Sequence, residues 1–264
     1  MENTLSAKAA FEKESVSVFE SMRGYAGVIF RFEDHWERLQ ASAKTAGLRI
    51  GKTAGEIRRM AYGELGRSGK KDAFLRVTVF PQGVLVTVTT RAYPAEIFER
   101  GVKIVTGTVK KNLSRSFYPE AKTSTYLGQV MATFEAAPDA FEILFLGEEG
   151  FVRETRNSNV FMVKNNRLFT APLAGILEGV TRKVVLECAL EIGLGAEEDF
   201  FTRHELFNAD EVFLTNTSGE IIPVRELDNR RTGGQIPGLW TKRLMNRFRI
   251  KVNQYKKERG RVEN

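Results

Sequence analysis

The stretch AFLRVTVFPQGVLVTVTT, residues 73–90, decides the fold class. Its two apolar, β-branched runs, 73–80 and 84–90, are typical of β-strands, and the Pro81-Gln82-Gly83 triplet between them is typical of a turn. Strands joined by so short a turn run antiparallel, because a parallel neighbour needs a crossover of about a dozen residues or more. The stretch therefore predicts a β-hairpin and argues against a doubly wound parallel sheet.

Short strands and helices alternate on both sides of this hairpin. The hydrophobic periodicity and the turn residues predict a mixed α+β fold with antiparallel or mixed sheets. The expected strands are 16–20, its hairpin partner 25–30, 101–108, 141–146, 151–154, 159–163, 167–170, 211–215 and 220–224. One expected helix begins at an Asp34 N-cap, and the others span about 53–66, 123–136 and 180–192.

A polar, basic segment at 110–120 is the expected domain boundary. It separates a small N-terminal α/β domain, residues 1–109, from a larger domain over residues 121–264. A chain of 264 residues has the length for one large or two small domains.

Several protein classes are disfavoured by composition. One cysteine, Cys188, excludes an intramolecular disulfide and a multi-thiolate metal site, and two histidines leave little for a His-rich cluster. No apolar run approaches the roughly 18–20 residues that cross a bilayer, and the N-terminus does not read as a signal peptide. We therefore expect no metal, no membrane association and a cytoplasmic location.

The net charge of +7 is concentrated near the C-terminus. Residues 242–261 hold nine Lys or Arg and one Glu. This basic segment leaves a non-catalytic nucleic-acid binder as a remote alternative. Leu244, Phe248 and Val252 recur every four residues, which favours an amphipathic helix packed on the body with a solvated basic face. We therefore do not expect nucleic acid as a partner.

Four separated segments carry the functional signal. They are VFESMRGY (18–25) with HWERL (35–39); KTSTYL (122–127); EGFVRE (149–154) with NVF (159–161), TAP (170–172) and GILEGVTR (175–182); and EVFL (211–214) with Thr217 and EIIPV (220–224). In this order they resemble the class IV aminotransferases, the fold-type IV pyridoxal phosphate enzymes, which include branched-chain and D-amino-acid aminotransferases and aminodeoxychorismate lyase. The resemblance runs from about residue 16 to 225.

The resemblance implies a two-domain fold with a small α/β N-terminal domain and a larger, mixed-sheet, barrel-like, cofactor-binding C-terminal domain. It also implies a homodimer whose active sites lie at the subunit interface. The cofactor implied is pyridoxal 5′-phosphate, with an amino acid and a 2-keto acid as the small-molecule partners.

The resemblance assigns the cofactor ring to four residues. Lys122 would form the Schiff base, because a primary amine does so reversibly, and its amine must be partly deprotonated near pH 7. Glu154 would stabilise the protonated ring nitrogen. Tyr126 matches the tyrosine that bonds the ring hydroxyl, and Leu177 the residue packed on the ring face.

The cofactor phosphate needs cationic or N–H donors. Gly179, Val180 and Thr181 open the expected helix 180–192, where backbone N–H groups without helical partners can bind an anion. The resemblance adds Arg38 as the phosphate cation and Thr217 as a hydroxyl donor.

For the substrate, the resemblance implies Tyr25, Arg76 and Ser218. Phe74-Leu75-Arg76 keeps the arginine but lacks the tyrosine of the branched-chain Tyr-x-Arg pattern, and Arg76 could bind a carboxylate through two parallel bonds. The turn 81–84 lacks the Arg-x-His pair of D-amino-acid enzymes and is short, as in the lyase, whereas KTSTY resembles the transaminases. We therefore predict a transaminase acting through Lys122, with aminodeoxychorismate lyase as the alternative.

Overall fold

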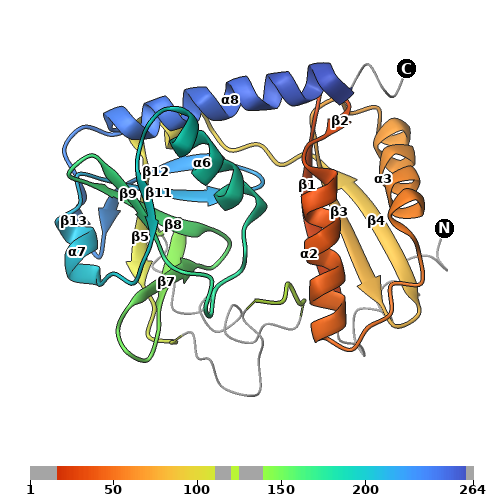
Figure 1. The fold of residues 1–264 in the computed structure, drawn as a ribbon, viewed down its shortest axis with the longest axis horizontal. Helices are drawn as coiled ribbons and strands as arrows, with labels where there is room; N and C mark the ends of the chain where they lie inside the picture. The colour runs from red at the N-terminus through yellow and green to blue at the C-terminus, as the bar shows by residue number, and fades with distance from the viewer. Residues whose placement is uncertain (1–16, 111–119, 125–138, 260–264) are drawn as a thin grey trace. The chain divides into compact units, whose positions relative to one another are not determined.

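The computed structural model describes residues 17–110, 120–124 and 139–259 (Figure 1). These residues fall into two compact units. Unit 1 contains residues 17–90 and 121–124, and unit 2 contains residues 91–110, 120 and 139–259.

Unit 1 is built on a four-stranded antiparallel sheet of order β2-β1-β3-β4. Its centre is the predicted hairpin, in which Val79 pairs with Val84 and Phe80 with Gly83. The predicted pairing of strand 16–20 with strand 25–30 was wrong. Residues 18–20 pair with β3, and the turn falls inside the expected second strand, where Tyr25 pairs with Val28. The strands are β1 (Val18–Tyr25), β2 (Val28–Ile29), β3 (Ala73–Phe80) and β4 (Gly83–Thr89).

Two helices, α2 (Phe32–Thr45) and α3 (Ala54–Ser68), share one hydrophobic core with this sheet. A capping box begins α3, because the Thr53 side chain accepts from Glu56 N and Glu56 accepts from Thr53 N. The prediction that Asp34 is an N-cap was wrong: α2 begins at Phe32, and Asp34 lies in its first turn, where a carboxylate stabilises the positive end of the helix dipole.

The segment 121–124 extends the sheet of unit 1 beside β1. Thr123 forms an antiparallel bridge with Val18, and Ser124 N donates to Ser17 O at 2.9 Å. The helix expected over 123–136 therefore does not begin at Thr123, and its residues from 125 onward lie outside the described part of the chain.

Unit 2 contains a nine-stranded mixed sheet. The path β8-β11-β12-β5-β6-β7 returns to β8 through an additional β7–β8 pairing, so six strands close a barrel. This confirms the expected α+β, barrel-like architecture. The strands are β5 (Val102–Thr106), β6 (Glu142–Leu146), β7 (Val152–Thr155), β8 (Asn159–Lys164), β9 (Arg167–Thr170), β10 (Ala196–Glu198), β11 (Glu211–Asn216), β12 (Glu220–Leu227) and β13 (Arg230–Arg231).

Strand β5 follows the N-terminal elements in sequence but belongs to the sheet of unit 2. It pairs in parallel with β12 on one side and with β6 on the other. Both partners lie far along the chain, so the local sequence pattern predicts the strand but not the sheet it joins.

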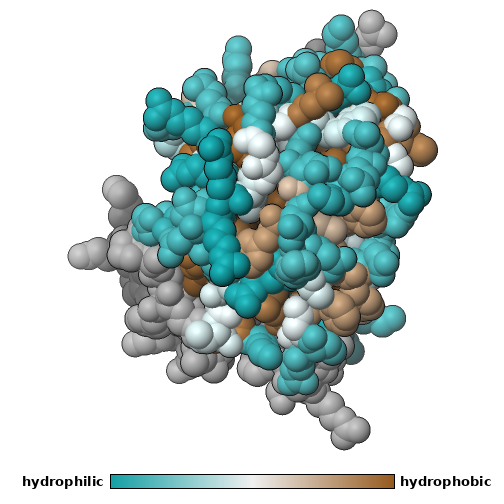
Figure 2. Space-filling view, turned by 90° about the vertical axis from the view of Figure 1, so that its left-hand side faces the viewer, coloured by the Kyte–Doolittle hydropathy of each residue, from teal (hydrophilic) through white to brown (hydrophobic). Residues whose placement is uncertain are grey.

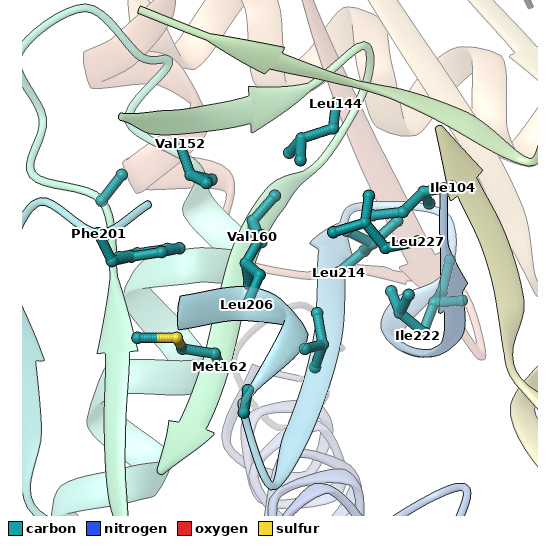
Figure 3. Close-up of a cluster of buried hydrophobic side chains, with 14 of the residues drawn as sticks. Ile104, Leu144, Val152, Val160, Met162, Phe201, Leu206, Leu214, Ile222 and Leu227 are labelled. Carbon is teal, nitrogen blue, oxygen red and sulfur yellow. The ribbon is translucent and has the colours of Figure 1, made fainter. Parts of the chain in front are cut away.

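Each of the six barrel strands contributes to one hydrophobic cluster (Figure 3). Leu206 joins it from α7 (Arg203–Phe207), together with Phe201 from the preceding loop. The labelled strand residues are Ile104, Leu144, Val152, Val160, Met162, Leu214, Ile222 and Leu227.

The other helices in the described part of unit 2 are α4 (Glu96–Arg100), α6 (Val180–Glu191) and α8 (Leu239–Arg259). The predicted apolar stripe of the C-terminal helix is confirmed, since Leu244, Phe248 and Val252 are all buried. Within the described residues, no helix is long and apolar enough to cross a membrane. On the face in Figure 2, hydrophobic areas lie between hydrophilic side chains, as is usual for a surface in contact with water.

Candidate active site

Lys122 is held by its backbone from two elements of unit 1. Its carbonyl accepts from Phe19 N of β1 at 3.0 Å, and its N–H donates to Ser42 Oγ of α2 at 3.1 Å. Ser42 is buried, so this contact is shielded from water. The partly buried side chain carries Nζ to 4.9 Å from the centroid of the Phe19 ring.

Arg76 lies against the same aromatic ring. Its Cζ is 3.7 Å from the Phe19 centroid, and NH2 donates to Ser124 Oγ at 3.3 Å. The π-face of an aromatic ring attracts cations. Phe19 therefore contacts both Arg76 of β3 and Lys122 of the segment 121–124, which places the two cations in one small region of unit 1.

The surroundings of Lys122 favour its neutral amine. Burial, together with the positive charges of Arg38 and Arg76, lowers the pKa of Lys122 from 10.5 to about 8, although the negative charge of Glu20 opposes the shift. About a tenth of such an amine is deprotonated at pH 7. Lys122 can thus act as a nucleophile or as a proton acceptor near neutral pH.

Arg38 is bound to a carboxylate that the sequence motifs did not single out. Glu20 is fully buried on β1. Arg38 Nε donates to its Oε1 and Arg38 NH2 to its Oε2, both at 2.7 Å, and His35 Nδ1 lies 2.8 Å from Oε2. Burial alone would raise the pKa of Glu20, but the charge and hydrogen bonds of Arg38 and the contact with His35 lower it to about 2.

A sequence signal for Glu20 was present. Alternation along β1 places Glu20 on the same face as Val18 and Met22, both of which are apolar. An acidic residue on a buried strand face needs a cationic partner. His35 and Arg38, three residues apart on the helix that follows, offer one face to such a strand.

In unit 2, Glu154 sits at the centre of a second polar cluster. It lies on β7 directly opposite Asn159 of β8. Its Oε2 accepts from Asn159 Nδ2 and from Leu177 N, each at 3.1 Å, and the same amide donates to Leu177 O at 2.9 Å. Glu154 is buried. These bonds fix the carboxylate and the loop that carries Leu177.

The start of α6 follows this loop. Gly179 is the N-cap and has no side-chain capping bond. A Cβ atom at 179 would lie 2.0 Å from Asn159 Oδ1, so only glycine permits the close approach. The first intrahelical bond runs from Lys183 N to Gly179 O. The N–H groups of Val180 and Thr181 therefore have no helical partner, a donor arrangement that suits an anion.

The turn between β11 and β12 carries Thr217 and Ser218. Ser218 is buried and Thr217 is half-buried. The neighbouring Asn216 Nδ2 donates to Ser158 Oγ at 2.9 Å, which ties this turn to the residue before Asn159. Both hydroxyls thus lie on a turn that is anchored next to the Glu154 cluster.

The structure brings Lys122, Arg38 and Arg76 together in unit 1, and Glu154, Leu177 and Gly179 together in unit 2. Tyr25 lies six residues along β1 from Phe19, about 20 Å on an extended strand, and so apart from Lys122. Its ring is 5.8 Å from that of Phe30.

Tyr126 lies outside the described residues. Among the residues that the structure does describe, no group of three or more His, Cys, Asp or Glu side chains could hold a metal ion.

Comparison with known proteins covers most of the chain. Residues 17–227 match the sequence model of a family described as amino-transferase class IV. The chain is 31% identical to the D-alanine aminotransferase of Bacillus licheniformis over 239 residues, which cover 86% of this chain and 84% of that protein.

Solved structures share the fold. The branched-chain aminotransferase of Thermoproteus uzoniensis with norvaline superposes with a TM-score of 0.80 at 32% identity, covering 88% of this chain and 84% of that one. The T.th. branched-chain amino acid aminotransferase with pyridoxamine 5′-phosphate gives 0.81 at 27% identity, covering 88% and 83%. The similarity includes elements of both units.

Proposed function

The chain belongs to the class IV aminotransferase family and is a transaminase, and from this premise we propose that it uses pyridoxal 5′-phosphate bound at Lys122. The observation that carries the proposal is the Lys122 amine, whose pKa of about 8 results from burial and from two nearby arginines. A partly deprotonated amine can attack an aldehyde near neutral pH, which an ordinary lysine does poorly.

The residues present fit this cofactor. Lys122 supplies the amine, Glu154 a buried carboxylate for the ring nitrogen, and Leu177 an apolar side chain for the ring face. For the phosphate, unit 2 offers the N–H groups at the start of α6 and the hydroxyl of Thr217. The family resemblance adds Arg38 of unit 1, and this role stays a prediction. A role for Tyr126 stays a prediction.

When bound, pyridoxal phosphate supplies an aldehyde that condenses with amines and a protonated ring that withdraws electrons from the substrate Cα. Lys122 Nζ, with its lowered pKa, would accept the proton from that Cα and donate it again later in the reaction. Glu154 holds the ring nitrogen in its protonated form, because a carboxylate stabilises an adjacent cation. Its two N–H donors fix the orientation in which it does so.

For the substrate, we propose an amino acid and a 2-keto acid whose carboxylate is bound by Arg76. Two parallel guanidinium hydrogen bonds would fix the plane of the carboxylate. The stacking on Phe19 and the bond to Ser124 limit the rotation of Arg76. Ser218 is a second candidate for this contact, and a substrate role for Tyr25 stays a prediction.

The central experiment titrates the purified protein with pyridoxal phosphate and records the visible absorbance of the bound cofactor. Borohydride reduction followed by peptide mass spectrometry should find the cofactor covalently attached to Lys122. Lys122→Ala should lose both the band and turnover. A protein that binds no cofactor, or whose reduced adduct maps to another lysine, would contradict the proposal.

The lyase alternative is not favoured, because the named relatives are aminotransferases. It predicts release of pyruvate from aminodeoxychorismate while the cofactor stays in its aldehyde form. Single half-reactions with a panel of L- and D-amino acids test both, since transamination converts the cofactor to its amine form. The same panel identifies the substrate side chain and the stereochemical preference.

A homodimer is proposed from the family resemblance, and light scattering should then give twice the 29.8 kDa chain mass. Cytoplasmic location stays a prediction, as does the absence of nucleic acid among the partners. The burial of the apolar stripe of α8 supports a structural role for the basic C-terminal helix.

A further inference from the structure

Glu20 is a buried carboxylate to which the proposed reaction assigns no task. It lies on β1 at 0% exposure. Burying an ionised carboxylate is costly unless charged and hydrogen-bonding partners surround it. Its partners here are His35 and Arg38, and Arg38 is the proposed phosphate cation.

The contact between Glu20 and Arg38 fixes a plane and not only a distance. Two parallel bonds of 2.7 Å join Nε and NH2 of Arg38 to the two carboxylate oxygens. A guanidinium held in this way cannot rotate about its own axis. The pair uses two of the five N–H groups of Arg38 and directs the others away from Glu20.

His35 completes the arrangement from one turn earlier on α2. Glu20, with a pKa of about 2, is ionised and can only accept hydrogen bonds. His35 Nδ1, at 2.8 Å, must therefore carry the proton that it donates. Burial lowers the pKa of His35 in spite of the opposing effect of Glu20. His35 is thus neutral near pH 7, as the Nδ1–H tautomer.

Titratable groups from four segments act on the Lys122 amine or on Glu20. They are Glu20 from β1, Arg38 and His35 from α2, Arg76 from β3 and Lys122 itself. Among the described residues whose charges act on Lys122, Glu20 is negative, and Arg38 and Arg76 are positive. Removal of Glu20 would leave Lys122 facing uncompensated cations.

We propose that Glu20 is a positioning residue of this transaminase, which orients the guanidinium of Arg38 for the cofactor phosphate and balances the cationic charge around Lys122. The proposal rests on the proposed function. The main effect of Glu20 on phosphate binding is then the orientation of the Arg38 guanidinium. A negative charge near an anion site is in itself repulsive, so any favourable effect of Glu20 on phosphate binding must come from the orientation of Arg38 and not from the charge of Glu20.

The Glu20→Gln variant separates the two effects, because it removes the charge and allows at most one strong bond to Arg38. If orientation dominates, affinity for pyridoxal phosphate and for inorganic phosphate falls by about tenfold or more, the scale of one charged hydrogen bond. If charge repulsion dominates, both affinities rise. Equilibrium titration by absorbance and by calorimetry measures them, and unchanged or tighter binding would overturn the proposal.

Glu33→Gln is the matched control. Glu33 lies on α2 of the same unit and pairs with Arg58 at 2.6 Å, with its side chain 43% exposed. It has the same charge as Glu20 but is not among the partners of Lys122. Its removal should leave phosphate and cofactor affinities unchanged. Equal losses in both variants would show that the effect is not specific to Glu20 and would contradict its proposed role.

Two readouts need no bound cofactor. The chain has two histidines, so nitrogen-15 NMR can assign His35 and His204 readily. His35 should be a neutral Nδ1–H tautomer at pH 7, and an Nε2–H or cationic ring would overturn the arrangement. In Glu20→Gln, the Lys122 amine should react faster with an acylating reagent at pH 7, because the charge that raises its proton affinity is gone. An unchanged rate would contradict the charge-balancing role.

The Glu20→Asp variant provides a second test if Glu20→Gln does not fold. It keeps the negative charge, but its side chain is one methylene group shorter, so the carboxylate lies farther from Arg38. It should lose phosphate affinity while Lys122 reactivity stays near that of the wild type. If wild-type protein binds no pyridoxal phosphate, the proposed function fails, whereas phosphate titration, the His35 tautomer and Lys122 reactivity still decide the role of Glu20.

Discussion

Gly179 and Asn159 lie so close together that a Cβ atom on residue 179 would stand 2.0 Å from Asn159 Oδ1. The same Asn159 side chain donates to Glu154 Oε2 and to Leu177 O. The start of α6, the loop before it and the buried carboxylate are therefore linked through one amide. A displacement at any of the three is passed to the other two.

Gly179→Ala should destabilise unit 2 by about 1–3 kcal/mol, because the added methyl group forces Asn159 or the helix start to move. It should also weaken the binding of pyridoxal phosphate, since the N–H groups of α6 shift with the helix. Thermal unfolding and cofactor titration measure the two effects. Gly195→Ala is the control, because the nearest atom to its added Cβ is Arg167 Nε at 4.0 Å. Equal behaviour of the two variants would argue against the steric explanation.

Glu154→Gln should retain cofactor binding but reduce turnover by about a hundredfold or more, because a neutral amide does not stabilise a protonated ring nitrogen. Stopped-flow half-reactions separate proton transfer from binding. Glu149→Gln, which alters an exposed carboxylate five residues earlier, should retain wild-type rates. Unchanged turnover in Glu154→Gln would remove Glu154 from its proposed role.

Lys122 should make stability depend on pH. Its pKa is lowered from 10.5 to about 8 in the folded chain. Between these values the unfolded chain binds more protons, so the free energy of unfolding rises with pH. The cofactor-free wild type should therefore gain stability relative to Lys122→Met from about pH 8 to 10.5. Urea unfolding at several pH values measures this. Lys44→Met, an exposed lysine of the same unit, controls for charge loss, and parallel pH profiles would contradict the assignment.

Glu20 should make stability depend on pH in the acidic range. Its pKa is lowered from 4.5 to about 2 in the folded chain. Its contribution to stability is fully present above pH 4.5 and is lost as the pH falls toward 2, because the unfolded chain takes up the proton first. The stability difference between wild type and Glu20→Gln should shrink over this window. Acid unfolding followed by circular dichroism measures it, with Glu33→Gln as the reference. A constant difference would show that Glu20 is not the titrating group.

Glu211→Ala should cost roughly 2 kcal/mol of stability. Glu211 lies on β11 and accepts from Trp240 N at 2.9 Å and from Thr241 N at 2.7 Å, so it caps α8 from another element. Urea unfolding gives the loss. Glu197→Gln breaks an exposed pair with Arg167 and should change stability by less than about 1 kcal/mol. Equal losses would show that the cap contributes no more than a surface ion pair.

The local pattern was sufficient wherever neighbours in sequence decide the structure. The hairpin 73–90 needs only its two apolar runs and its turn. The stripe Leu244, Phe248 and Val252 needs only the period of a helix. The Asp34 cap, in contrast, was misplaced by a few residues. The start of a helix depends on the backbone conformation of the residue before it, and here Arg31 adopts φ 54°.

Elements whose partners are distant could not be predicted in the same way. Strand β5 pairs with β12, more than 100 residues away. The sequence indicates that Glu20 is buried, but only the structure shows that α2 brings His35 and Arg38 into contact with it. Its role requires burial, which a sequence pattern indicates but does not measure.

The sequence by itself determined many of the strands and helices and the family, and it singled out Lys122 as the proposed cofactor lysine, because turn residues, periodicity and ordered motifs are local properties. Only the tertiary structure decided the surroundings of that lysine and therefore its pKa. The pKa of Lys122 depends on Arg38, Arg76 and Glu20, which are 46 to 102 positions away in the chain. Burial and Coulomb interactions depend on distances in space, and folding alone sets those distances.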